Sequence, residues 1–325
     1  MRKKLFFRAD GNSTIGRGHI SRCLAAAFML KDELDIVFVC FTPNVAYLTQ
    51  IVTEFKVYGI DCDEDLLAIL TAQDYLWLDG YDFAEGFKKM IRPHVAKLIE
   101  TNDIPYPAQN VDILVNHTPG LTKEMFAPYN PNTEFCLGLD YALLRPKFLE
   151  IAQQPPKPPA GVGVFICFGG ADTYNLGEKF VSALLAANFT EPIYWVVKSE
   201  AQMDMFLAKN VHTLFRLNEE DMIHYMTKAK LLIIPSSVMC FEAIALRKAI
   251  FTCWFVDNQE LIYNGVVKEK LVSGHGYIST KGEVQKAVKS FISLYKHKEI
   301  YIEQLENQFR LFNGKSDLNI KQIVE

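Results

Sequence analysis

The chain has 325 residues, half of them hydrophobic, which is enough for two cores in domains of about 150 residues each. Its formal net charge of −4 argues against general nucleic-acid binding, which needs a basic surface. The seven cysteines stand singly without a C-x-x-C pair, so no zinc ribbon or thioredoxin-type motif is predicted, and a reducing, cytoplasmic location is expected.

Short apolar runs alternate with helical patterns along the first half of the chain. Continuous apolar runs are typical of strands that are buried on both faces of a parallel sheet. The first run follows basic residues but is too short for a signal peptide, so it predicts a strand. The predicted strands of this half are 4–9, 35–40, 74–79, 95–101, 111–116 and 133–138.

The second half repeats the alternation. Its predicted strands are 162–169, 192–197, 211–217, 230–236 and 249–255, and its helices include 175–187 and 237–249. Amphipathic helices at 286–312 and 317–325 follow. The whole pattern predicts an α/β protein with two doubly wound, Rossmann-like parallel-sheet domains and an interdomain cleft for the ligand. No apolar run reaches the ~18 residues that a membrane span needs.

A proline-rich stretch marks the expected domain boundary. Four prolines stand within residues 152–161, and such segments stay extended and separate domains. We therefore expect an N-terminal domain at 1–152, a linker at 153–161 and a C-terminal domain, including the last helices, at 162–325.

The loop after the first strand carries candidate site residues. Gly16 and Gly18 permit tight turns and a close approach of a ligand to the backbone. His19 stands at the predicted start of a helix, where free N–H groups attract anions such as phosphate. It is either a capping or packing histidine or a general base, since imidazole titrates near neutral pH. The spacing is not G-x-G-x-x-G, so dinucleotide binding is not predicted.

Other polar residues follow the predicted strands of the second half. Gly169 and Gly170 allow backbone N–H groups to approach a diphosphate, or they form an ordinary strand-to-helix turn. Glu242 stands in an apolar helix, where an unpaired carboxylate is unfavourable. Asn258 and Gln259 offer amides to a sugar, or they cap a helix.

The segment 8–27, RADGNSTIGRGHISRCLAAA, resembles the N-terminal signature of the PseG family, also called SpsG-like. The matching residues are Arg8, Ala9, Asp10, Ile15, Gly16, Gly18, His19, Arg22, Cys23 and Leu24. The likeness continues over nearly the whole chain at Asp79, Tyr81, Asn116, Tyr141, Leu144, Arg145, Gly169, Gly170, Ala171, Asp172, Asn175, Glu242, Asn258 and Gln259.

This resemblance implies the GT-B fold of the MurG-like glycosyltransferases and no metal or other cofactor. The family removes UDP from UDP-2,4-diacetamido-2,4,6-trideoxy-β-L-altropyranose by adding water at the sugar carbon, in pseudaminic acid biosynthesis. The catalytic set that it implies is His19 as the base, with Tyr81 and Asn258. Glu242 would accept hydrogen bonds from the ribose. The implied substrate-binding set is Asp10, Gly16, Gly18, Arg22, Arg145, Gly169, Gly170, Ala171, Ser237, Glu242 and Gln259.

Two segments depart from the family's pattern. Residues 234–239 read IPSSVM in place of GAGGST, so Pro235, Ser236 and Ser237 restrict how closely a phosphate can approach. Residues 100–107 read ETNDIPYP where the family carries a D-D pair after its fourth strand. The exact sugar and nucleotide therefore stay open.

Two other functions remain possible on the same residues. One is a GT-B glycosyltransferase with a UDP-sugar donor, in which an acceptor hydroxyl replaces water. The other is a non-catalytic sugar-nucleotide-binding protein. In every case the expected partner is a small UDP-linked sugar, without nucleic acid or a membrane span, and a monomer is favoured.

Overall fold

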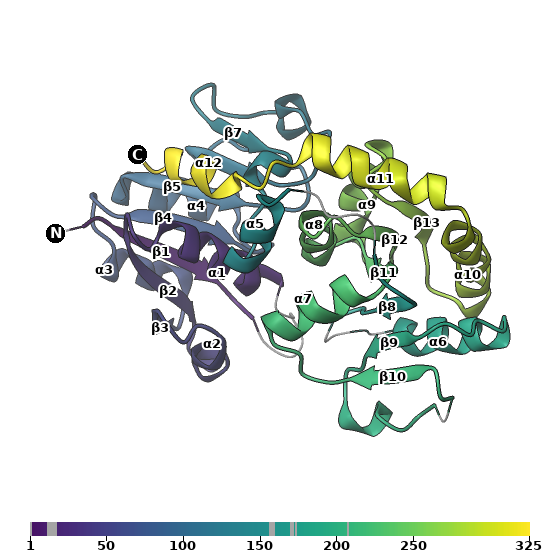
Figure 1. The fold of residues 1–325 in the computed structure, drawn as a ribbon. Helices are drawn as coiled ribbons and strands as arrows, with labels where there is room; N and C mark the ends of the chain where they lie inside the picture. The colour runs from purple at the N-terminus through teal and green to yellow at the C-terminus, as the bar shows by residue number, and fades with distance from the viewer. Residues whose placement is uncertain (1, 12–17, 156–159, 170–171, 173, 207) are drawn as a thin grey trace. The chain divides into compact units, whose positions relative to one another are not determined.

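The computed structural model describes residues 2–11, 18–155, 160–169, 172, 174–206 and 208–325. These residues form two compact units: unit 1 is Met1–Leu149 with Lys315–Glu325, and unit 2 is Glu150–Gly314. Each unit contains one sheet with all strand pairs parallel and helices packed around it (Figure 1). The predicted α/β class with two doubly wound sheets is confirmed.

The sheet of unit 1 has seven strands in the order β3-β2-β1-β4-β5-β6-β7. The strands are β1 (Lys4–Ala9), β2 (Asp35–Phe41), β3 (Lys56–Ile60), β4 (Tyr75–Asp79), β5 (Lys97–Thr101), β6 (Ile113–Asn116) and β7 (Glu134–Leu137). The central strands β1 and β4 are buried on both faces, which explains their continuous apolar runs. All strands run parallel, but the order in which they are added along the sheet switches from one side of β1 to the other, between β1 and β4. Doubly wound sheets bind ligands at such a switch point, beyond the carboxyl ends of the strands.

Helices connect these strands. They are α1 (Gly18–Leu30), α2 (Val45–Ile51), α3 (Leu66–Ile69), α4 (Glu85–Ile91) and α5 (Pro146–Ala152), and the division between the units falls within α5. Leu76, Leu78, Leu98 and Leu114 form the core on one face of the sheet. On the other face, Phe7 lies between Phe38 and Trp77, with ring centroids 5.3 Å from each.

The sheet of unit 2 has six strands in the order β10-β9-β8-β11-β12-β13. The strands are β8 (Val164–Ile166), β9 (Ile193–Val196), β10 (Val211–Leu214), β11 (Leu231–Pro235), β12 (Ala249–Trp254) and β13 (Ser273–Tyr277). The helices are α6 (Leu176–Ala186), α7 (Glu219–Lys228), α8 (Val238–Ala245), α9 (Glu260–Lys268), α10 (Lys281–Lys296) and α11 (Lys298–Leu311). In this sheet the strand order switches between the parallel strands β8 and β11.

Two edge strands have no counterpart among the predicted runs. The residues of β3 are mostly exposed, and β13 has the polar, glycine-containing sequence SGHGY. An edge strand pairs on one side only and needs less apolar surface, so a search for continuous apolar runs does not find it.

The last helix belongs to a different unit from the one that we expected. We expected residues 317–325 to continue the C-terminal domain, whereas α12 (Ser316–Gln322) packs in unit 1. Ser316 Oγ donates to the carbonyl of Ala142 at 2.8 Å, and Lys97 Nζ donates to the carbonyl of Ile323 at 2.7 Å. The buried Ile320 completes this contact. The linker expected at 153–161 stays a prediction, since part of it lies outside the described residues.

Within the described part of the chain, no helix combines the length and the apolar character that crossing a membrane requires.

Candidate active site

The carboxyl ends of β1, β4, β5 and β6 lie next to one another in the sheet of unit 1. His19 is the second residue of α1, which follows β1. Asp79 is the last residue of β4, and Asp103 follows β5 by two residues. The fold therefore brings residues from distant parts of the chain to one edge of the sheet, where ligands of doubly wound proteins bind.

His19 and Asp79 form a buried hydrogen-bonded pair. The Nδ1 atom of His19 lies 2.6 Å from Oδ1 of Asp79. Because a carboxylate only accepts hydrogen bonds, Nδ1 carries the ring hydrogen and donates it. The lone pair then resides on Nε2, which can accept a proton. A tenth of the His19 side chain remains exposed, whereas Asp79 is fully buried.

Arg22 joins this pair to a second carboxylate. Its Nε and Nη2 atoms donate to the two oxygens of Asp79 at 3.0 and 2.6 Å, and its Nη1 donates to Oδ1 of Asp103. Burial lowers the pKa of Arg22, but the carboxylates of Asp103 and Asp79 outweigh burial and raise the pKa well above its usual value. Arg22 is therefore a fixed cation.

Arg22 also lies close to the imidazole ring. Its Nη2 is 3.0 Å from Nδ1 of His19. Both nitrogens carry hydrogens, so this separation is not a hydrogen bond and follows from their shared partner, Oδ1 of Asp79.

Tyr81 contacts both His19 and Asp103. Its hydroxyl donates to Oδ2 of Asp103 at 2.8 Å, and its ring meets that of His19 edge-on with centroids 4.8 Å apart. Burial opposes ionisation of Asp103, yet Arg22 and the hydrogen bond from Tyr81 hold the pKa of Asp103 below its usual value. We call His19, Arg22, Asp79, Tyr81 and Asp103 the acid–base cluster.

Two described residues beside the acid–base cluster, His117 and Cys23, are uncharged at neutral pH. Burial and the nearby Arg22 lower the pKa of His117, which follows β6, to about 4. Burial and the charge of Asp79 raise the pKa of Cys23, whose thiol donates to Asp79 Oδ2 at 3.8 Å. Two carboxylates against one guanidinium leave one excess negative charge in the cluster. An imidazolium at His19 would therefore have a counterion within hydrogen-bond distance.

The other predicted residues of unit 1 have structural contacts. Asp10 accepts from Arg8 Nη1 at 2.5 Å, and its second oxygen accepts from the backbone N–H of Phe41 and from Asn44 Nδ2 at 2.9 and 2.8 Å. Its carboxylate therefore joins the ends of β1 and β2. The Arg145 guanidinium lies 4.8 Å from the ring centre of Phe148.

The glycines predicted in the first loop are only partly covered by the structure. Gly18 is the first residue of α1, and an added Cβ there would meet no described atom within 4 Å. Gly16 lies outside the described residues.

In unit 2, the predicted glycine turn follows β8. Gly169 has a positive φ of 78°, which favours glycine. Gly170 and Ala171 lie outside the described residues. Asp172 accepts from the backbone N–H groups of Leu176 and Gly177 at 2.6 and 2.9 Å, so it caps the start of α6.

The altered segment IPSSVM joins β11 to α8. Ser237 is the residue before α8 and makes no capping hydrogen bond through its side chain. Ser236 is buried, and its hydroxyl oxygen lies 3.2 and 3.0 Å from the carbonyl oxygens of Cys253 and Gln259, which share its single hydrogen as acceptors. Ser236 thus ties this turn to the loop after β12.

Glu242 is buried on α8. Burial raises the pKa of Cys167 to about 12, and the negative charge of Glu242 adds to the rise. The helix α8 begins just after the carboxyl end of β11, which pairs with β8, so Glu242 is the fifth residue of a helix that starts at the edge of the sheet where ligands bind.

Asn258 and Gln259 lie in a short turn after β12. Gln259 is buried, and its Oε1 accepts from the backbone N–H of Phe255 at 3.2 Å, so this side chain shapes the turn. Asn258 is half-buried. It belongs to unit 2, whereas His19 and Tyr81 belong to unit 1, and its place in the catalytic set stays a prediction.

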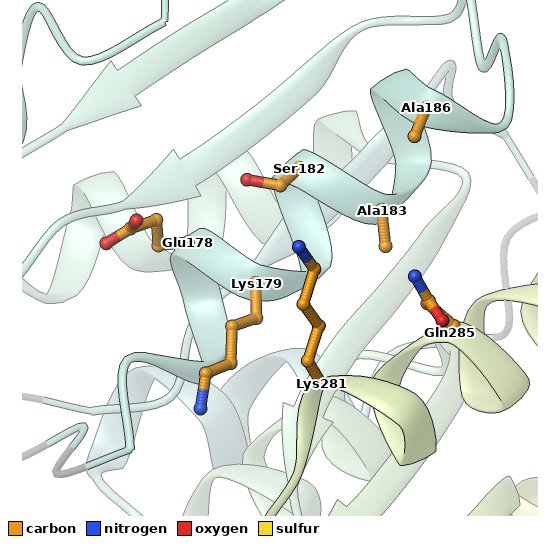
Figure 2. A pocket seen from close by; sticks show the side chains of 7 residues that line it. All are labelled: Glu178, Lys179, Ser182, Ala183, Ala186, Lys281 and Gln285. Carbon is orange, nitrogen blue, oxygen red and sulfur yellow. The ribbon is translucent and has the colours of Figure 1, made fainter.

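Two further findings bear on cofactors and pockets. Within the described residues, no three His, Cys, Asp or Glu side chains gather as a metal site would require. A surface cavity of about 350 Å³ lies between α6 and α10, and it is lined by Lys281 and Gln285 of α10 and by residues of α6 that include Glu178, Lys179 and Ser182 (Figure 2). None of the predicted site residues lines it.

Comparison with known proteins supports the predicted relationship, although no family model matches the chain. The UDP-2,4-diacetamido-2,4,6-trideoxy-beta-L-altropyranose hydrolase of Campylobacter jejuni is 27% identical over 271 residues, which are 79% of this chain and 93% of that protein. The resemblance to the PseG family is confirmed.

Solved structures show the same architecture. MurG from Acinetobacter baumannii matches with a TM-score of 0.70 and 13% identity over 99% of both chains. Arabidopsis thaliana UGT89C1, complexed with quercetin, matches with a TM-score of 0.68 and 11% identity over 100% of this chain and 99% of its own. At these identities the likeness concerns the fold alone, and it confirms the predicted GT-B fold.

Sequence reasoning gave His19, Arg22 and Tyr81 but missed Asp103, which we treated only as part of an altered segment. The available signal was its position, because an acidic residue just after a strand that neighbours β4 must lie at the same edge as Asp79. His117 was missed for the same reason after β6.

Proposed function

We propose that the protein is a nucleotide-sugar hydrolase of the PseG type, which releases UDP from a UDP-linked diacetamido-trideoxy-hexose in the synthesis of a pseudaminic-type acid. The observation that carries the proposal is the pair of His19 and Asp79, whose contact leaves Nε2 of His19 as a proton acceptor. The similarity to the Campylobacter jejuni hydrolase supports the choice of substrate.

In the proposed reaction, water attacks C1 of the sugar while Nε2 of His19 takes one of its protons. The bond between C1 and the diphosphate oxygen breaks, and its electron pair leaves with UDP. Asp79 holds the tautomer and orientation of the ring and faces the imidazolium that forms. Arg22 fixes both carboxylates, so the pair needs little rearrangement during the reaction.

The residues of unit 2 are proposed to bind the nucleotide. Glu242 would accept hydrogen bonds from the ribose hydroxyls, as the PseG resemblance implies. Gly169 leaves space for a diphosphate at the end of β8, because no described atom lies within 4 Å of a Cβ built there. Asn258 and Ser237 are proposed to contact the substrate beside them.

The proposal is tested by incubating the protein with a panel of UDP-, GDP- and CMP-linked sugars and measuring nucleotide release. Release of UDP and free sugar without any acceptor would support hydrolysis. Release only with an added acceptor would identify a glycosyltransferase, and binding without release would identify a sugar-nucleotide-binding protein. His94→Asn is a suitable control for a His19→Asn variant, because His94 is an exposed histidine of the same unit.

A further inference from the structure

Asp103 occupies a fixed position beside Tyr81. Its side chain is buried, with one oxygen bound to Arg22 and the other to the Tyr81 hydroxyl. The loop that carries it is also anchored, because Tyr106 donates to the buried Glu100, and Lys88 Nζ lies 3.2 Å from both oxygens of that carboxylate. The carboxylate that accepts the Tyr81 hydroxyl hydrogen is therefore held in place by its own contacts.

This contact determines what Tyr81 can offer to a ligand. A phenol has a single hydroxyl hydrogen, and Tyr81 gives it to Asp103. Towards any other group the oxygen acts as an acceptor, and the bond to a carboxylate polarises the hydroxyl and strengthens this capacity. Half of the Tyr81 side chain is exposed beside His19, the base of the proposed reaction.

We propose that Asp103 is a positioning residue that makes Tyr81 Oη an acceptor for the amide N–H of an acetamido group on the sugar. This inference rests on the proposed function and adds a selection for N-acetylated sugars. A site that is built to accept a hydrogen bond discriminates against an analogue that lacks the donor.

The alternative is that Asp103 only neutralises Arg22. In that case Asp103→Asn and Tyr81→Phe would act independently, and neither would change the preference between an amide and an isosteric ester. The two substitutions therefore separate a positioning role from a purely structural one.

The experiment compares UDP-2,4-diacetamido-2,4,6-trideoxy-altropyranose with its O-acetyl analogue, in which esters replace both amides. Dissociation constants and kcat/KM are measured for the wild type, Asp103→Asn, Tyr81→Phe and the double variant. The control is Asp112→Asn, because Asp112 accepts from Arg92 Nε at 2.9 Å in the same unit and lies outside the acid–base cluster.

The wild type and the control should prefer the amide over the ester by about 10-fold to 100-fold, the range for one buried hydrogen bond. Each single variant should lose most of this preference, and the double variant should lose no more than the stronger single one. A preference that survives in either single variant, or losses that add in the double variant, would overturn the proposal.

A measurement without substrate tests the contact itself. The ¹⁹F resonance of 3-fluorotyrosine at position 81 should shift in Asp103→Asn and stay in place in Asp112→Asn, and an unmoved resonance in Asp103→Asn would overturn the inference.

Binding measurements separate this inference from the proposed function. An amide preference in affinity that Asp103→Asn removes, without any turnover by the wild type, would keep the inference and reject the hydrolase. Failure of the wild type to bind the amide more tightly would reject the inference alone.

Discussion

Replacing Asp79 by Asn would separate the base of the proposed reaction from its partner while keeping the volume of the side chain. Asp79 is fully buried and accepts from His19 Nδ1 and from two nitrogens of Arg22 at 2.6 to 3.0 Å. An amide group directs two N–H donors into this site. If the NH2 group faces Arg22, donors oppose donors. If the NH2 group faces His19, it donates to Nδ1, and the ring hydrogen of His19 must then move to Nε2, which can no longer accept a proton.

The expected magnitude follows from these contacts. The same replacement behind the histidine of a Ser-His-Asp triad lowers kcat by ~10⁴, and a positioned base contributes about 10² to 10⁴-fold. We therefore expect kcat for UDP release to fall by about 10² to 10⁴-fold. Breaking the buried pair with Arg22 should also reduce the free energy of unfolding by about 3 to 5 kcal/mol.

The assay is UDP release under saturating UDP-sugar, at a temperature where circular dichroism shows that the variant is folded. Asp74→Asn is the control, because Asp74 is also buried, stands just before the opposite end of β4, and accepts from the N–H and hydroxyl of Thr71, both at 2.8 Å. Asp74→Asn should lose stability but keep its turnover. A folded Asp79→Asn protein with turnover within about threefold of wild type would refute the reasoning, since a positioned base is expected to contribute at least ~10².

Three further predictions follow from the same geometry. His19→Asn should lose about 10² to 10⁴-fold in turnover and keep its affinity for UDP by calorimetry, whereas His94→Asn should keep both; unchanged turnover in His19→Asn would remove His19 from the mechanism. Glu242→Gln should weaken UDP binding by about 1 to 3 kcal/mol, with the exposed Glu299→Gln as its control, and equal affinities would exclude the assigned ribose contact. The native state takes up the proton of His117 only near pH 4, whereas the unfolded state takes it up near pH 6.5, so falling pH favours unfolding in this window. When the pH falls from 7 to 5, the free energy of unfolding measured by urea denaturation should therefore decrease by about 2 kcal/mol more in the wild type than in His117→Asn. Equal decreases in the two proteins would contradict a neutral, buried His117.

The sequence was sufficient to predict the central strands and the presence of two doubly wound parallel sheets. Strands such as β1 and β11 are apolar on both faces, so their composition alone identifies them. The edge strands β3 and β13 are exposed or polar, and α12 packs in unit 1 through contacts with Ala142 and Lys97 that are far away in the sequence. Contacts of this kind depend on tertiary packing and leave no local pattern.

The candidate site shows the same division. His19, Gly18 and Arg22 lie close together in the chain, and a motif can reveal them. The partner of His19 is 60 residues away, and Asp103 is 81 residues from Arg22. Which carboxylate reaches which base depends on the register of β1, β4 and β5, and a single sequence does not specify that register.

The central claim is that His19 delivers water to C1 of the sugar, and hydrolysis in ¹⁸O-labelled water tests it most directly. Mass spectrometry of the products should find the label in the free sugar and unlabelled UDP, because the bond between C1 and the diphosphate oxygen breaks. Label in the UDP phosphate would show attack at phosphorus and contradict the account, even if the protein proved to be a hydrolase.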